Sequence, residues 1–119
     1  MSDENDLAKL RKNRSIRRGL VTKTENQIRT LLQNFSFDNE DHEAKLEGLR
    51  NQYDSRLQSV KNLDQFILNL TEPDNYETEL IDTEEYYDLS FEVFAKIGQK
   101  LNRNRVTTTT PTAPVNSNH

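Results

Sequence analysis

Residues 46–70, LEGLRNQYDSRLQSVKNLDQFILNL, contain the pattern that decides the fold. Apolar side chains recur there at alternating steps of three and four residues, and Arg56 fills the one charged position. The apolar positions are Leu46, Leu49, Tyr53, Val60, Leu63, Ile67 and Leu70. This spacing places them on one stripe of an α-helix. The segment therefore predicts a long helix that buries one side.

The same spacing occurs on both sides of this segment. In the earlier stripe, Arg14, Arg17 and Thr24 occupy the positions that are not apolar, and in the later stripe Glu84 and Gly98 do so. The earlier stripe consists of Leu7, Leu10, Val21, Ile28, Leu31 and Phe35, and the later one of Leu80, Tyr87, Phe91, Phe94 and Leu101. The sequence thus predicts three long helices that bury their stripes against one another. Gly98 would lie between the helices and permit their close approach; the alternative is that this glycine has no packing role.

The breaks between the stripes set the helix bounds. We expect helices at about residues 6–34, 40–70 and 77–101. Ser36, Asp38 and Asn39 are candidate N-caps for the second helix, and Pro73 ends it because proline cannot continue a helix. Short connections make consecutive helices antiparallel. The predicted fold is all-α, an elongated up-down-up three-helix bundle of coiled-coil type.

The two ends of the chain differ from this pattern. Residues 1–5 are acidic and polar, and we expect them to be flexible. Residues 102–119 contain four consecutive threonines and two of the three prolines. We expect this segment to be a disordered linker or tail.

Composition limits the class of protein. The 119 residues suffice for one domain, with 32% hydrophobic and 30% charged residues and no cysteine. Disulfides and thiolate metal sites are therefore excluded. The sequence contains no signal peptide and no apolar stretch of membrane-spanning length. We expect an intracellular, cytoplasmic protein.

Charged residues are segregated along the chain. Seven basic residues and no acidic one occur from Lys9 to Lys23, namely Lys9, Arg11, Lys12, Arg14, Arg17, Arg18 and Lys23. Nine acidic residues and no basic one occur from Glu72 to Glu92, namely Glu72, Asp74, Glu77, Glu79, Asp82, Glu84, Glu85, Asp88 and Glu92.

The two charged runs are expected to face each other. In an up-down-up bundle the first and third helices are parallel, so the basic half of one lies beside the acidic half of the other. We expect Arg14 and Arg17 to meet Glu84 or to pair with Glu79. The alternatives are that the basic run binds nucleic acid or an acidic membrane surface.

The sequence offers no set of residues suited to catalysis. Such a site needs a nucleophile, a base and a pocket, and the only histidines are His42, near a helix start, and His119. The acidic cluster at 38–43 lacks the glycine and spacing of a calcium loop, and acidic residues are expected at a helix start. We expect no enzyme, no metal, no cofactor and no small-molecule substrate.

The third predicted helix carries a second apolar stripe, made of Tyr86, Leu89, Val93 and Ile97. Leu89 lies two positions from Phe91, about 200° round the helix axis. We expect this stripe to contact a second copy of the chain or a following domain; the alternative is a more deeply inserted helix. Glu84, Asp88 and Glu92 recur at every fourth residue, where like charges repel, and predict a solvated or partner-facing acidic stripe.

Three motifs, at residues 7–23, 45–54 and 84–97, resemble the N-terminal helical region of the Gag-like polyproteins of Bel/Pao-type LTR retrotransposons. The first is LAKLRKNRSIRRGLVTK at residues 7–23, which is similar to the basic opening of that family. The second is the Lys45–Leu49 segment with Tyr53 and Asp54, and the third is the acidic-aromatic stretch at 84–97. A Thr/Pro-rich segment follows in the family, as it does here at 107–118.

The resemblance implies an N-terminal assembly region with no catalytic residue, because the family's enzymes lie outside this region. The cysteine-free sequence also implies no zinc knuckle here. We therefore expect a non-catalytic structural or interaction module whose partner is a protein. The alternative is a nucleic-acid-binding module that uses the basic first helix.

Overall fold

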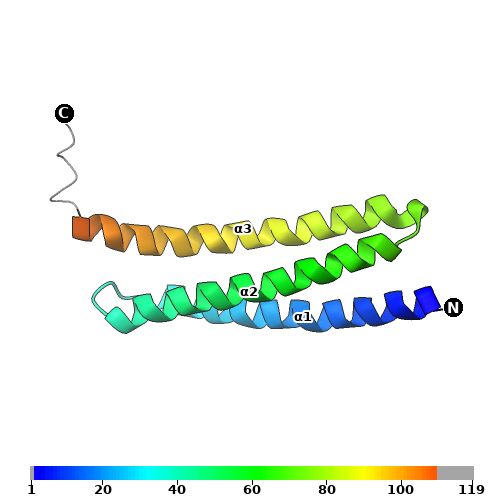
Figure 1. Ribbon diagram of the computed structural model, residues 1–119. Coiled ribbons are helices and arrows are strands. Elements are labelled where there is room, and N and C mark those ends of the chain that lie inside the picture. Colours follow the sequence, from blue (N-terminus) through cyan, green and yellow to red (C-terminus); the bar gives the residue numbers. More distant parts are fainter. Residues whose placement is uncertain (1, 110–119) are drawn as a thin grey trace, which may run out of the picture.

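The computed structural model describes residues 2–109, with side chains at 5–102. Three helices account for almost all of this range: α1 (Ser2–Gln33), α2 (Glu40–Leu70) and α3 (Pro73–Thr109). They run up, down and up along a body 65 Å long (Figure 1). The predicted all-α, up-down-up three-helix bundle is thereby confirmed.

The bounds of α2 agree with the prediction, and its start has a local cause. Asn39 is the N-cap, and its side-chain Oδ1 accepts a hydrogen bond from the Asp41 backbone nitrogen at 2.9 Å. A side-chain acceptor at this position satisfies one of the backbone donors that a helix start leaves unpaired. The His42 ring nitrogen Nδ1 accepts a bond from the Ser36 backbone at 3.0 Å and ties the loop to α2.

Both ends of α3 and the start of α1 extend beyond the predicted bounds, and α1 begins at Ser2, inside the segment predicted to be flexible. Helix α3 begins at Pro73 itself, since a proline at the first helical position loses no hydrogen bond. It continues past Leu101 to Thr109 because no proline or glycine interrupts residues 99–109. The rest of the predicted tail, residues 110–119, lies outside the described residues, as does Met1.

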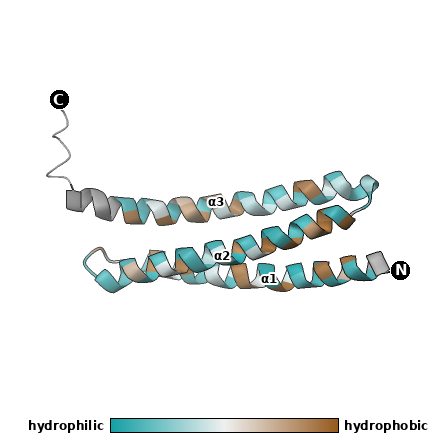
Figure 2. Cartoon of the chain, viewed as in Figure 1, coloured by the Kyte–Doolittle hydropathy of each residue, from teal (hydrophilic) through white to brown (hydrophobic). Residues whose placement is uncertain are grey.

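Two helices form a closely packed pair, and the third runs alongside them. The α1–α2 contact is the most extensive in the bundle, and α3 contacts α2 more than α1. In Figure 1, α2 lies between the other two helices, and the α1–α2 loop is at the same end as the C-terminal part of α3. The apolar segments along each helix are short and alternate with hydrophilic ones (Figure 2).

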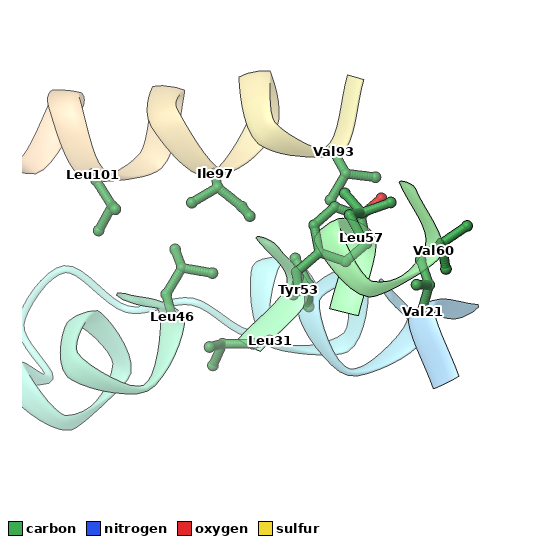
Figure 3. Packing of buried hydrophobic residues seen from close by; sticks show 10 residues of the cluster. Val21, Leu31, Leu46, Tyr53, Leu57, Val60, Val93, Ile97 and Leu101 are labelled. Atoms are coloured by element: carbon green, nitrogen blue, oxygen red, sulfur yellow. The ribbon is translucent and has the colours of Figure 1, made fainter. Parts of the chain in front are cut away.

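A continuous apolar core connects the three helices. Figure 3 shows Ile97 and Leu101 of α3 directed toward Leu46 of α2, and Val93 directed toward Tyr53. The buried cluster comprises Val21, Ile28, Leu31, Leu46, Tyr53, Leu57, Val60, Val93, Ile97 and Leu101. The predicted stripes of the first two helices supply most of the α1 and α2 members, so their register was predicted well.

From Glu79 to Ile97 the buried positions of α3 lie one residue before the predicted ones, a difference of about 100° of helix rotation, whereas Leu101 is buried as predicted. The buried positions are Glu79, Thr83, Ser90, Val93, Ile97 and Leu101, with Tyr86 packed at their edge. Phe91, which the sequence places in the core, has 67% of its surface exposed. The polar side chains are buried because each has a partner. Glu79 binds Arg14, and the hydroxyls of Thr83 and Ser90 donate to backbone carbonyls of α3.

The predicted partner stripe Tyr86, Leu89, Val93 and Ile97 is therefore corrected. Val93 and Ile97 are core residues, and Tyr86 is half-buried against them. Leu89 is the exposed member of the stripe, with 62% of its surface in solvent. The alternative prediction was that α3 is inserted more deeply into the bundle. It is correct for Tyr86, Val93 and Ile97.

Two further features of the described residues concern close helix approach and membrane spanning. A Cβ atom at Gly98 would meet no atom within 4 Å, so no helix approaches closely there, contrary to the prediction. No described helix has a stretch long and apolar enough to cross a membrane.

Candidate functional site

A charged network joins all three helices near the α2–α3 connection. Arg14 of α1 donates from Nη1 to Asp64 Oδ1 of α2 at 3.0 Å and to Glu79 Oε2 of α3. Tyr87 of α3 donates its hydroxyl to the other oxygen of Asp64 at 2.5 Å. Only 1% of the Asp64 surface is exposed. This carboxylate is thus buried with a cation and a hydroxyl donor, which buried charges require.

Burial and hydrogen bonding shift the proton equilibria in this network. Burial of the Arg14 guanidinium opposes its charge, but the hydrogen bonds to Glu79 and Asp64 outweigh that effect and raise its pKa. The pKa of Tyr87 is also raised, chiefly by burial and then by its bond to Asp64. Both shifts keep the protonated donor in place.

The sequence anticipated part of this network. The predicted pairing of Arg14 with Glu79 is confirmed, whereas Arg17 does not meet Glu84. Arg17 donates instead to the Ser59 hydroxyl at 2.8 Å, because it lies on the α2 side of α1. The role of Asp64 was not predicted from the sequence. Its position between Val60 and Ile67, inside an apolar stripe, was the signal that could have indicated a buried carboxylate.

A second polar contact fills a layer farther along the bundle. Arg56 of α2 donates to the Thr24 hydroxyl of α1 at 2.6 Å and to the Leu20 carbonyl at 3.2 Å. Thr24 and Arg56 are the polar interruptions of the two predicted stripes. They meet because antiparallel packing brings these positions to the same level.

The basic run divides into an inward and an outward set. Arg11 and Arg18 reach α3, where they pair with Glu79 at 3.5 Å and Asp82 at 3.3 Å. Together with Arg14, these arginines confirm that the basic half of α1 lies beside the acidic half of α3. The outward set consists of Lys9, Lys12 and Lys23, all exposed, whereas Arg17 is exposed but reaches Ser59 of α2.

The outward lysines share one face of α1 with exposed apolar residues. Lys9, Lys12, Ile16, Leu20 and Lys23 recur at steps of three and four residues, and we refer to them as the lysine face. Ile16 lies two positions from Arg14, about 200° round the helix, and 59% of its surface is exposed. Around Ile16 the lysine face therefore points away from the bundle.

Helix α3 presents an oppositely charged face. Glu77, Leu80, Glu84, Asp88 and Phe91 are all exposed on one side of the helix, and we refer to them as the acidic-aromatic face. Tyr87 and Phe94 border it and are half-buried against α2, where the Phe94 ring contacts Tyr53 with centroids 5.1 Å apart. Most of the stripe that the sequence assigned to the core thus exists as this outer face and its border.

A shallow groove lies between α1 and α2, with a volume of about 600 Å³. Leu31 and Leu49 contribute to its lining, and Lys23 and Lys45 carry its positive charges. Lys23 thus belongs both to this groove and to the lysine face. Within the described residues, no three His, Cys, Asp or Glu side chains form a group that could hold a metal ion.

The fold and its surfaces define an all-α chain with a polar network inside and two oppositely charged faces outside. No protein-family model, curated protein or solved structure matches it.

Proposed function

We propose that this chain is a non-catalytic assembly module that acts inside the cell and binds a second copy of itself through the acidic-aromatic face of α3. The module would correspond to the Gag-like N-terminal region of a retrotransposon-derived protein. The observation that carries the proposal is Phe91, a large aromatic side chain with 67% of its surface in solvent.

The surroundings of Phe91 support the proposal. Leu80 adds apolar surface to the same face, and Glu84 and Asp88 lie between them. Apolar residues rimmed by charge are typical of protein contact sites. The two carboxylates, four residues apart, repel each other in the isolated helix, and a cationic partner would relieve that repulsion.

Sedimentation of two matched variants tests this function. Phe91→Gln and Leu89→Gln each remove one exposed apolar side chain from α3, and the two positions are similarly exposed, at 67% and 62%. They point in directions about 200° apart. The wild-type chain and the Leu89→Gln variant should self-associate with increasing concentration, whereas Phe91→Gln should stay a single chain. A monomeric wild-type chain, or equal loss in both variants, would reject the proposed function.

Nucleic-acid binding is the alternative, and the exposed Lys9, Lys12, Arg17 and Lys23 favour it. Against it, Arg11, Arg14 and Arg18 are engaged by carboxylates of α2 and α3. Binding to random-sequence duplex DNA would weaken steeply with salt, because log K falls by about 0.9 per phosphate contact for each unit of log[salt]. Apolar self-association would change far less.

A further inference from the structure

We propose that the surface which receives the acidic-aromatic face is the lysine face of α1 on a second copy of the chain. This inference rests on the proposed function and names the contact that it needs. Two complementary surfaces on one chain, on different helices, would then join successive copies.

The first argument is charge. The lysine face carries Lys9, Lys12 and Lys23, which are exposed and form no ion pair with any residue at positions 5–102. The acidic-aromatic face carries an equal number of carboxylates. Lys9 and Lys12 lie three residues apart and repel each other, as do the carboxylates of the other face. Contact between the two faces therefore relieves repulsion on both sides.

The second argument is spacing. Successive residues of the lysine face are separated by three, four, four and three positions. The residues of the acidic-aromatic face have the same separations. Aligned antiparallel, the two series match Asp88 with Lys12, Leu80 with Leu20, and Glu77 with Lys23. Such an alignment gives two charge pairs and one apolar pair, and it places Phe91 opposite Lys9 and Glu84 opposite Ile16.

The third argument is the kind of surface. Ile16 and Leu20 are exposed among the lysines. Contacts with phosphates are made by hydrogen-bonding and cationic groups, and apolar side chains contribute little to them. A helix that carries both carboxylates and apolar residues matches both components of the lysine face. A second copy of this chain supplies such a helix.

Geometry determines the form of the assembly. Ile16 points away from the core, whereas the acidic-aromatic face borders α2 through Tyr87 and Phe94. One contact uses the lysine face of one copy and α3 of the next, and it leaves one surface of each copy exposed. Such head-to-tail contacts add further copies instead of closing at two. The average mass should therefore continue to rise with concentration.

The test uses two variants that each lack one surface. Lys9→Glu with Lys12→Glu removes the lysine face, and Phe91→Gln removes the aromatic part of the other face. Each variant alone should sediment as a single chain. Their equimolar mixture should form a complex of two chains and no larger species, since each variant supplies the surface that the other lacks.

Matched controls separate the surface from general charge effects. Lys45→Glu with Lys96→Glu makes the same change in net charge at exposed positions outside both faces and should associate like the wild-type chain. Circular dichroism should show full helicity in every variant. Increasing the salt from about 0.1 M to about 1 M, which shortens the Debye length from about 10 Å to about 3 Å, should weaken but not abolish association.

Several results would overturn the inference. If the wild-type chain associates and Phe91→Gln abolishes it, but the Lys9/Lys12 variant still associates, the receiving surface lies elsewhere and the proposed function stands. If the equimolar mixture of the two variants remains monomeric, the receiving surface likewise lies elsewhere. If the Lys9/Lys12 variant loses binding to duplex DNA and keeps its self-association, the lysine face serves nucleic acid. A wild-type chain that never associates rejects the function and the inference together.

Discussion

The two ends of the bundle are held together by different chemistry. Near the α2–α3 connection, Arg14, Asp64 and Glu79 form a buried charged network. Near the α1–α2 loop, apolar side chains such as Leu46 and Ile97 fill the space (Figure 3). Apolar burial is non-directional, whereas charged hydrogen bonds fix both partners in orientation. We infer that the charged end sets the register of α3 and that the apolar end supplies most of the stability.

Removing the cation should give the largest effect. Arg14→Met leaves the buried Asp64 without a cation and Glu79 with only the more distant Arg11, and breaking a buried pair costs about 3–5 kcal/mol. Arg17→Met is the matched control, because Arg17 is exposed, and it should change the free energy of unfolding by less than about 0.5 kcal/mol. Urea unfolding measures both, and similar losses in the two variants would refute a special role for Arg14.

The apolar end should respond to truncation according to the observed register. Ile97→Ala removes a fully buried side chain and should cost about 2–5 kcal/mol. Phe91→Ala removes a larger but exposed side chain and should cost about 0.5 kcal/mol or less in the monomer. Thermal unfolding in dilute solution compares them, and the reverse order would mean that Phe91 is the core residue.

Alkaline pH should weaken the charged end. A tyrosine in the unfolded chain has a pKa of about 10, and the pKa of Tyr87 is raised by burial and by its bond to Asp64. Above pH 10 the unfolded chain loses a proton that the folded chain keeps, so stability declines as pH rises.

The variant Tyr87→Phe isolates this contribution. It should flatten the decline by up to about 1.4 kcal/mol per pH unit, as measured by urea unfolding between about pH 8 and pH 11. Equal slopes for wild type and Tyr87→Phe would contradict the proton linkage.

The smallest predicted effect concerns Gly98. Because a Cβ atom there meets no neighbour within 4 Å, Gly98→Ala should stabilise the helix by about 1 kcal/mol. Gly48→Ala, equally open in α2, should give a similar gain. A loss of stability in the Gly98→Ala monomer alone would show that this position makes a close contact after all.

The helices and the register of α1 and α2 could be predicted, because their apolar spacing is regular and α2 has a clear cap at Asn39. The register of α3 could not. Its larger apolar residues, such as Phe91 and Leu80, lie one position from the buried ones. The burial of Glu79 depends on Arg14, some 65 residues earlier in the chain, and no local pattern contains that information.

The candidate site was likewise predicted only in part from the sequence. The basic and acidic runs predicted that α1 and α3 lie side by side, as the Arg18–Asp82 ion pair confirms. The partner stripe around Val93 was wrong, since those side chains fill the core. Which cations of the basic run remain exposed depended on the orientation of α1 against its neighbours, which only the packed structure supplies.

The orientation of α3 is the central claim, and thiol labelling tests it most directly. The chain contains no cysteine, so Phe91→Cys and Val93→Cys each introduce a single reactive group. In dilute solution, the thiol at position 91 should react at nearly the rate of the unfolded chain, and the thiol at 93 should be protected until the protein unfolds. Protection at 91 with rapid reaction at 93 would contradict the account, because α3 would then bury the acidic-aromatic face.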